Sequence, residues 1–565
     1  MFKKLFPFLN WPRPTRSSLQ DDVIAGLTVA LLATPQALAH AQLAGVPAYW
    51  GLYAVLLPTV IGALYGSSPQ LSTGTTALCA MLTAASIAPL AAPGSEKYLD
   101  CVVLLALLSG LIQLVLGALR MGILLNFLSH PVLIGFINAA VLLIGLSQLP
   151  PLTGIDVAAS LSVLQASWQV VTHLSTMHTP SLAFGVGAIV AMLTFRRMAP
   201  RFPGVLATAA ACTFLSWRAG FAAGGGAVVG DIPAGLPALS LPTAEWGSAI
   251  ALLPAAFVLA LISFMEATSS CKVLATKTRS RWDENQELIG QGMAKIAAAL
   301  THTMPVSGSF ARSALSYTSR ARSGLSSIVC AVVVLIVLLF LTDLLHHLPQ
   351  SVLAAIILVP LSSVLDIAAM KQAWRASRDD GVAALVTFVA TLAFAPHIQN
   401  GVVTGIALSL MLLLYRRTRP RAIKVGMHQD GMLRDAARWA LPEIHPRIAA
   451  LRWDDSLLFV NCAWFEEAVL ELARTHPNAR YLLIAAGGIN DLDASGAELL
   501  ERLHDRLAEG GITLAMSAVK KQVMDVMDRI GLSACIGAEN IFATDRQALD
   551  ALIARLGGEA ETPAI

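Results

Sequence analysis

Residues 35–82 read PQALAHAQLAGVPAYWGLYAVLLPTVIGALYGSSPQLSTGTTALCAML, and they place prolines, glycines and hydroxyl side chains inside apolar segments of membrane length. Within hydrocarbon, an unpaired backbone group costs several kcal/mol, so interrupted helices are tolerated only where neighbouring protein or a water-filled cavity satisfies those groups. A plain membrane anchor needs no such interruption. The stretch therefore predicts a solute site inside a membrane domain.

The composition of the 565-residue chain is that of a polytopic membrane protein, with 56% hydrophobic and 13% charged residues and a mean hydropathy of +0.66. Charged residues are sparse between about Asp22 and Leu414 and frequent from Arg416 onward, which predicts a second, soluble domain. The net charge of +3 gives no indication of nucleic-acid binding. The cysteines are scattered without ligand spacing, so no metal site is expected. Without a nucleophile–base pattern or phosphate loop, neither an enzyme nor a cofactor is expected.

The fold class that we predict is a polytopic α-helical membrane protein followed by a small α/β domain. About fourteen segments are long enough to cross the membrane or half of it. Starting from a cytoplasmic N-terminus, their alternation puts almost all basic loops on the cytoplasmic side and leaves only Lys97 and Arg218 outside. The segments begin near residues 22, 48, 71, 100, 122, 180, 203, 248, 285, 308, 324, 350, 381 and 400. The predicted domains are a cytoplasmic N-terminal segment (1–20), a transmembrane domain (21–418), a linker (419–436), the α/β domain (437–556) and a tail (557–565).

Two polar, glycine-containing breaks indicate an inverted repeat. Residues 71–76 (LSTGTT) open the third segment and residues 305–309 (PVSGS) open the tenth, which is the third of a second set of seven. We therefore expect one repeat over about 21–218 and an inverted one over about 248–418. Matching breaks in inverted halves indicate a transport site near the bilayer midplane, where two helix N-termini hold an anion. The alternative is that the small residues make ordinary helix contacts.

The hydrophobic period changes after Pro420. Residues 456–460, 481–485 and 512–516 are expected to be strands, and residues 497–507 and 522–530 are expected to be amphipathic helices. Strands that alternate with helices predict a compact α/β domain.

The chain as a whole resembles the SulP (sulfate permease) family of anion transporters with a C-terminal STAS domain. The resemblance implies a seven-plus-seven inverted repeat with a moving core domain and a gate domain, elevator-type alternating access and a homodimer. The motifs that carry it are PQ at 35–36, LAGVP at 43–47, GLY at 51–53, LYGSS at 64–68, LSTG at 71–74, FME at 264–266, Lys272, NQELIG at 285–290 and PVSGSFARS at 305–313.

Arg312 matches the arginine at the family's anion site and is expected to supply the positive field for the substrate. A guanidinium inside a membrane needs a partner or an aqueous cavity, so structural pairing with Glu266 or a backbone carbonyl is the alternative. The backbone N–H groups and hydroxyls around Thr75, Thr76, Ser309 and Phe310 would add directed donors. Helix capping explains the same hydroxyls.

Glu266 corresponds to a carboxylate that contributes to a cation site in sodium-coupled bicarbonate members of the family, with Ser270 one turn further along. Those members have aspartate there, whereas this chain has glutamate, which argues against sodium. Burial disfavours the charged form of a carboxylate, so a buried glutamate could instead take up and release the coupling proton. The alternative is a static ion pair with Arg312 or Lys272.

His40 lies where the family usually has an aromatic residue beside the substrate, and its imidazole could bind the anion or couple transport to protons. A hydrogen bond to a neighbouring helix is the alternative. Gln36, four residues earlier on the same helix face, would add an amide.

In the α/β domain, Ser495 resembles the phosphorylatable serine of soluble STAS proteins, and phosphorylation there would be regulatory. A Ser or Asp just ahead of a helix is also a common N-cap.

Together these features predict a proton-coupled secondary transporter of a small oxyanion, with sulfate-like anions first and bicarbonate or a dicarboxylate as further possibilities. The alternatives are sodium-coupled bicarbonate symport, anion exchange, an anion channel or a STAS-based signalling scaffold. We expect the protein in a bacterial inner membrane, in contact with lipid, with its N-terminus and STAS domain in the cytoplasm. A cytoplasmic regulator of the STAS domain is a further expected partner.

Overall fold

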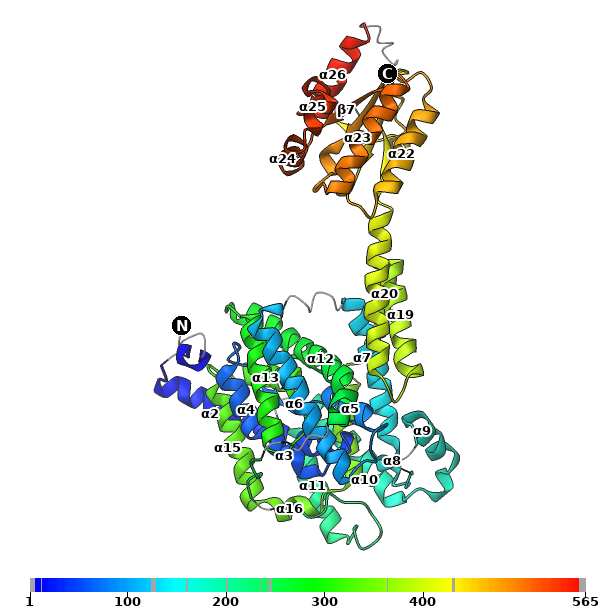
Figure 1. Cartoon of the computed structure of the whole chain (residues 1–565). Coiled ribbons are helices and arrows are strands. Elements are labelled where there is room, and N and C mark those ends of the chain that lie inside the picture. Colours follow the sequence, from blue (N-terminus) through cyan, green and yellow to red (C-terminus); the bar gives the residue numbers. More distant parts are fainter. Residues whose placement is uncertain are drawn as a thin grey trace. The chain divides into compact units, whose positions relative to one another are not determined.

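The computed structural model describes residues 6–557, with gaps at 12, 123–128, 159–160, 200–201, 234, 241, 243–245, 363 and 429–431. Its contacts divide the chain into a first unit, residues 1–409, and a second unit, residues 410–565 (Figure 1). Residues 1–5 of the predicted N-terminal segment and 558–565 of the predicted tail lie outside the described residues. The division falls inside one helix, α20 (Gln399–Thr418), and the predicted domain boundaries remain predictions.

A helix begins within six residues of each start predicted for an apolar segment, except the start near 122. There, residues 123–128 lie outside the described residues and α7 begins at His130. Seven helical segments are long and apolar enough to cross a membrane, and three shorter apolar helices accompany them among the described residues. The main helices of the first half are α2 (Arg16–Leu43), α3 (Ala48–Val55), α4 (Leu57–Tyr65), α5 (Ala77–Ile87), α6 (Glu96–Ala118), α7 (His130–Ser147), α10 (Thr179–Met198) and α11 (Gly204–Arg218). Those of the second half are α12 (Trp246–Thr278), α13 (Glu284–Leu300), α14 (Phe310–Thr318), α15 (Leu325–Phe340), α17 (Gln350–Leu361), α18 (Ile367–Ala376), α19 (Arg378–Ala393) and α20.

The interruptions expected in residues 35–82 do not all break a helix. Helix α2 continues through Pro35, whereas the chain turns at Leu56, between α3 and α4. Close packing of α3 on α2 accompanies the intact helix, since a Cβ at Gly51 would lie 1.9 Å from the carbonyl oxygen of Ala37. Pro58 lies in the first turn of α4, where its missing N–H has no cost.

The two predicted breaks meet each other. Strand β1 (Thr73–Gly74) pairs antiparallel with β2 (Ser307–Gly308), with Thr73 opposite Gly308 and Gly74 opposite Ser307. Each strand leads into a helix, β1 into α5 and β2 into α14. The pairing satisfies backbone groups that hydrocarbon would leave unpaired.

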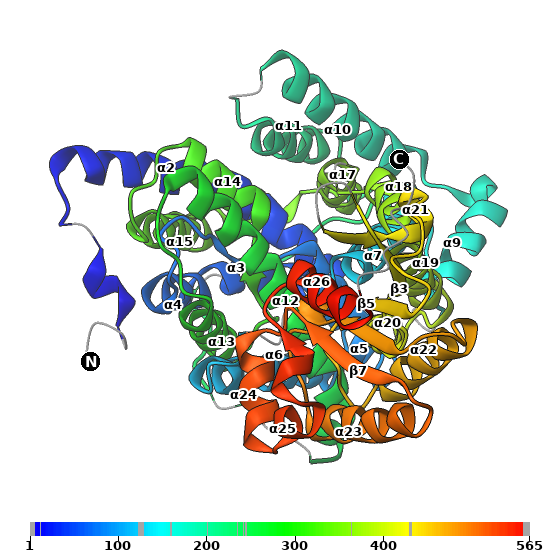
Figure 2. The same cartoon turned by 90° about the horizontal axis from the view of Figure 1, so that it is seen from above.

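The helices of the first unit form two groups that Figure 2 shows side by side. In one group, α6 packs on α13, α4 on α13 and α2 on α15. In the other group, α7 packs on α19 and α10 on α17. The two groups touch through α2 with α17 and α5 with α7. The paired breaks β1 and β2 belong to the first group, which we call the core group, and the second is the gate group.

The second unit is a six-stranded sheet in the order β4-β3-β5-β6-β7-β8, with β5 to β8 parallel. Alternate residues of β6 face opposite layers: Leu482 and Ile484 pack against helices α22 to α25, and Leu483 packs against α26. The strands are β3 (Ala422–Met427), β4 (Leu433–Asp435), β5 (Ile448–Trp453), β6 (Tyr481–Ala485), β7 (Thr513–Ser517) and β8 (Ile541–Phe542). The helices are α21 (Ala436–Trp439), α22 (Cys462–Thr475), α23 (Ala494–Glu509), α24 (Lys521–Arg529), α25 (Leu532–Ile536) and α26 (Asp545–Arg555).

The prediction of a strand over 456–460 is wrong, and the strand in question is β5, at 448–453. Asn461 bends the predicted segment into a turn, because its amide donates to the carbonyl of Ser456 (3.0 Å) and accepts from the N–H of Leu458 (3.0 Å). The strands predicted at 481–485 and 512–516 and both predicted helices are confirmed by β6, β7, α23 and α24.

Candidate functional site

The antiparallel pairing of β1 with β2 brings the N-termini of α5 and α14 into one region of the core group. Thr76 caps α5 by accepting from the N–H of Cys79, and Ser309 caps α14 by accepting from the N–H of Arg312. The N–H of Ser309 in turn donates to the carbonyl of Ser72 (2.9 Å). Capping therefore accounts for the hydroxyls of Thr76 and Ser309. The helix ends still carry partial positive charge, which favours an anion.

Arg312 is almost completely buried, at 1% exposure, beside these helix ends. Its Nη1 donates to the carbonyl of Thr75 (2.8 Å) and its Nε donates to Oγ of Ser72 (3.4 Å). Among the described residues, its Nη2 has no hydrogen-bond partner and its guanidinium makes no ion pair. The structural alternative, pairing with a backbone carbonyl, thus occupies part of the guanidinium and leaves both N–H groups of Nη2 open.

His40 and Gln36 are both buried on α2. Nδ1 of His40 lies 3.1 Å from Oγ1 of Thr75, whose carbonyl also accepts from Arg312. Thr75 therefore joins the histidine to the arginine. Gln36 lies one turn before His40 on the same helix, as expected from the spacing.

Glu266 is joined to the cap of α5, because Oγ1 of Thr76 donates to its Oε2 (3.0 Å). Ser270 lies on the next turn of α12, but its hydroxyl donates to the backbone carbonyl of Glu266 (3.1 Å) and not to the carboxylate. Lys272 pairs with Glu284 at 3.3 Å, so the proposed static pair of Glu266 with Lys272 is not formed. The carboxylate of Glu266 thus lies at the α5 end of the site. Its charge is opposite to that of Arg312.

A cavity of about 410 Å³ adjoins the two helix ends. It is lined by Ala77 of α5, by Glu266 of α12 and by the half-exposed Phe310 of α14 on the core side. Apolar side chains of α7 and α17 line the gate side. Of the predicted site residues, Glu266 and Phe310 line this cavity. The other residues of the membrane site are buried and are not part of its lining: Gln36, His40, Thr75, Thr76, Ser270, Ser309 and Arg312.

Sequence reasoning missed Lys295, which is fully buried on α13. Its Nζ donates to Oε1 of Gln113 on α6 (2.9 Å). The signal was present, because a lysine in the alanine-rich run MAKIAAAL is an ionisable residue inside an apolar helix, as Glu266 is.

In the second unit, Asp493 and not Ser495 caps α23, because its carboxylate accepts from the N–H of Gly496 (2.8 Å). Ser495 lies exposed in the first turn of the same helix. Its hydroxyl is therefore not used as the cap, and its regulatory role remains a prediction.

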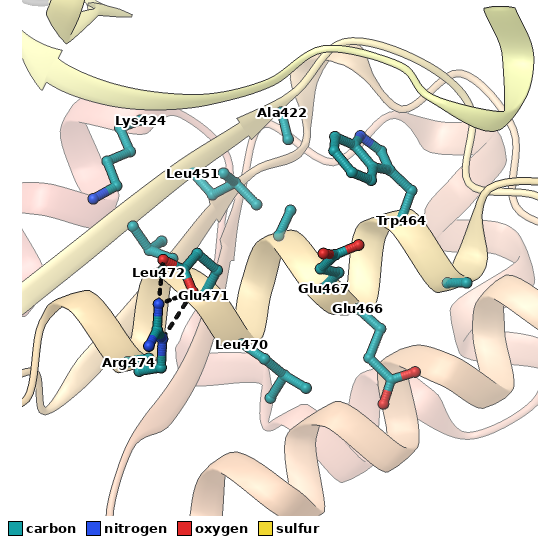
Figure 3. A pocket seen from close by; sticks show the side chains of 12 residues that line it. Ala422, Lys424, Leu451, Trp464, Glu466, Glu467, Leu470, Glu471, Leu472 and Arg474 are labelled. Atoms are coloured by element: carbon teal, nitrogen blue, oxygen red, sulfur yellow. Dashed lines mark hydrogen bonds and ion pairs between the residues drawn. The ribbon is translucent and has the colours of Figure 1, made fainter.

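A second cavity, of about 690 Å³, opens on the second unit between α22 and the strands β3 and β5 (Figure 3). Trp464 and Leu470 line it, and Glu471 pairs with Arg474 at its rim. The hydrogen bond from Arg474 lowers the pKa of Glu471. None of the predicted site residues lines this cavity, which has the character of an ordinary amphipathic groove.

Comparison with known proteins gives a consistent result over nearly the whole chain. Residues 19–387 match the model of the sulfate permease family, and residues 440–548 match that of the STAS domain. A probable sulfate transporter of Mycobacterium tuberculosis is 33% identical over 533 residues, which cover 94% of each chain. Probable sulfate transporter 4.2 of Arabidopsis thaliana is 30% identical over 570 residues, covering 97% of this chain and 84% of the relative. A structure of the murine anion transporter Slc26a9 in the inward-facing state is 21% identical with a TM-score of 0.90, and the match covers 98% of this chain and 94% of that one.

Proposed function

Since this chain belongs to the sulfate permease family, and is therefore a membrane anion transporter and not an enzyme, we propose that it carries out secondary active transport of a small oxyanion, with sulfate first. The family and the predicted fold class are confirmed by the matches to both domain models and by the structural similarity. The protein is an integral membrane protein.

The observation that carries the proposal is the open Nη2 of buried Arg312 between two capped helix N-termini. Taking a guanidinium out of water is unfavourable unless a partner meets its remaining donors. An oxyanion offers several acceptor oxygens and a negative charge, and so it meets both needs. Relatives named as sulfate transporters support sulfate as the first candidate. Bicarbonate and dicarboxylates present similar carboxylate or oxyanion oxygens and come next.

Protons are our proposed coupling ion. Glu266 lines the cavity and receives a hydrogen bond from Thr76, so one carboxylate can bind and release a proton next to the anion site. A sodium site shared by Ser270 and the Glu266 carboxylate is less favoured, because the Ser270 hydroxyl is directed at the backbone carbonyl of Glu266 and not at its carboxylate. His40, joined to Thr75, is a second group that can exchange protons.

Alternating access would follow from movement of the core group, which holds the site, against the gate group. The cavity lining includes Leu133 in the first turn of α7 and Leu361 at the end of α17. The distribution of basic residues puts these helix ends on the cytoplasmic side. An inward-facing state, a bacterial inner membrane location, a cytoplasmic STAS domain and a homodimer complete the proposal.

The test is uptake into proteoliposomes of labelled sulfate, bicarbonate and succinate, under an inward proton gradient and then an inward sodium gradient. We expect concentrative sulfate uptake driven by protons. Arg312→Ala should reduce it about tenfold to a hundredfold, since hydrogen bonds to a charged group contribute about 1.5–3 kcal/mol. Arg322→Ala is the matched control, because Arg322 is exposed and pairs with Asp21. Uptake driven by sodium alone would contradict proton coupling, and rapid passive flux without accumulation would contradict secondary transport.

A further inference from the structure

Lys295 is a buried cation with no counterion in contact. It has no exposed surface, and its Nζ makes one hydrogen bond, to the neutral Gln113, among the described residues. Gly110 gives it room on α6, since a Cβ there would lie 2.9 Å from Cβ of Lys295. An ammonium has three donors and is costly to remove from water. A neutral amide could make the same bond to Gln113, so the hydrogen bond alone does not account for the charge.

Polar contacts lead from Lys295 toward Glu266. Gln113 accepts from Lys295 and donates from Nε2 to Oγ of Ser263 (3.0 Å), one turn before Glu266 on α12. Ser307 of β2 donates to the carbonyl of Ser263 (2.9 Å). The ammonium is thus joined through Gln113 to Ser263 on α12, one turn before Glu266, and Ser263 is joined in turn to Ser307 of β2.

Few charged or titratable groups face Lys295 from the elements packed against it. Glu266 on α12 and the Cys79 thiol on α5 interact electrostatically with its ammonium group. Helix α4 has no Asp, Glu, Lys or Arg, and the charged residues of α6 are confined to its first turns. Glu287, two turns earlier on α13, is held by the N–H groups of Ser67 and Ser68 and by the amide of Gln291. Glu266 is therefore the carboxylate that Lys295 can balance.

Arg312 and His40 both contact Thr75, and Glu266 accepts from Thr76, the next residue. With His40 neutral, two cations and one carboxylate give the site a formal charge of +1, and a proton on Glu266 raises it to +2. That change matches the charge of a divalent oxyanion. This balance of charge between site and anion needs no bound metal cation.

We propose that Lys295 is a positioning residue that acts as the fixed internal countercharge of Glu266, so that proton binding by Glu266, and not sodium binding, controls the affinity for the anion. The inference rests on the proposed function and deepens it. The step moves one proton between water and the Glu266 carboxyl group, and it makes and breaks no other covalent bond. The ammonium supplies the charge that a coupling sodium ion would supply next to a carboxylate.

The test compares Lys295→Gln, which keeps an amide donor for Gln113, with wild type and with Lys272→Gln, which removes an exposed lysine of α12. We expect the pH profile of sulfate uptake in Lys295→Gln to move to higher pH by about one unit, because loss of a nearby cation eases protonation of a carboxylate. Sodium should also raise the melting temperature of purified Lys295→Gln, and should leave wild type and Lys272→Gln unchanged. The inference would be overturned if Lys295→Gln kept the pH profile of wild type and its melting temperature did not respond to sodium.

The melting arm separates this inference from the proposed function. If wild type accumulates none of the anions, proton-coupled transport fails, while the sodium response of Lys295→Gln still decides the role of Lys295. If Lys295→Gln cannot be purified, the double variant Glu266→Gln/Lys295→Gln replaces it. If the double variant can be purified in the same yield as Glu266→Gln, charge balance between the two residues is supported. If the double variant cannot be purified although Glu266→Gln folds, the inference is overturned.

Discussion

The two interrupted segments of the membrane unit share a backbone plan and differ in charge. Each has a two-residue strand, a hydroxyl N-cap and a helix: β1, Thr76 and α5 in one half, and β2, Ser309 and α14 in the other. The α5 cap holds the carboxylate of Glu266, whereas the α14 segment carries Arg312. The repeated backbone supplies two positive helix ends, whereas the side chains add a carboxylate to one half and a guanidinium to the other. In the proposed function, the carboxylate serves the proton and the guanidinium serves the anion.

The largest effect should come from removing the charge that only the α14 half carries. We expect Arg312→Gln to raise the KM for sulfate about tenfold or more, because the guanidinium offers two open donors and a full charge. Arg312→Lys should retain part of the affinity, since an ammonium keeps the charge and loses the planar fork. The KM for sulfate is measured in proteoliposomes for wild type, Arg312→Gln and Arg312→Lys. Equal KM values for the three proteins would show that Arg312 does not bind the anion.

The two strand glycines allow a sharper test of the same comparison. A Cβ at Gly308 would lie 2.9 Å from Cβ of Ala267, in fixed helix packing, whereas a Cβ at Gly74 would lie 2.9 Å from Nη2 of Arg312, at the end of a flexible side chain. Gly308→Ala should therefore destabilise the protein by about 1–3 kcal/mol. Gly74→Ala should leave stability nearly unchanged and weaken sulfate binding. Melting in detergent, followed by uptake, separates the two, and the reverse pattern would contradict this assignment.

Removal of the cap hydroxyl of α5 or of α14 should lower stability equally, but only removal of the α5 cap should change the pH dependence of uptake. Thr76→Val and Ser309→Ala should each cost about 1 kcal/mol, the usual value of an N-cap. Thr76 also donates to Glu266, so Thr76→Val should move the pH profile of uptake to higher pH, because its hydrogen bond favours the charged carboxylate. Ser309→Ala should leave the profile in place. Identical profiles would show that Thr76 acts as a cap alone.

The smallest effect is expected at a third cap, in the second unit. Asp493→Ala should lower the stability of that unit by about 1 kcal/mol, since its carboxylate caps α23. Ser495→Ala should change stability by less than about 0.5 kcal/mol, as is usual for exposed positions. Urea unfolding followed by tryptophan fluorescence measures both. A larger loss in Ser495→Ala would mean that its hydroxyl has a structural role.

The sequence predicted the helices, the two breaks and their meeting, because apolar runs and glycine-containing interruptions are local signals. It could not predict that Thr75 joins His40 to Arg312, or that Ser270 turns to its own helix backbone, since these depend on side-chain orientation across helices. The strand misplaced at 456–460 has a similar cause: its hydrophobic run is strand-like, and the bonds of the Asn461 side chain override it. Lys295 was visible in the sequence, and its neighbours were not.

The pairing of β1 with β2 has a consequence for biosynthesis. Residues 73–74 are synthesised long before Ser307 and Gly308. The first break therefore lacks its partner strand while helices α5 to α11 of the first half and the start of the second half are made. Neither half can close its own interruption. A protein cut short before β2 would therefore keep β1 without the strand that pairs with it, and its unpaired backbone groups would be costly within the bilayer.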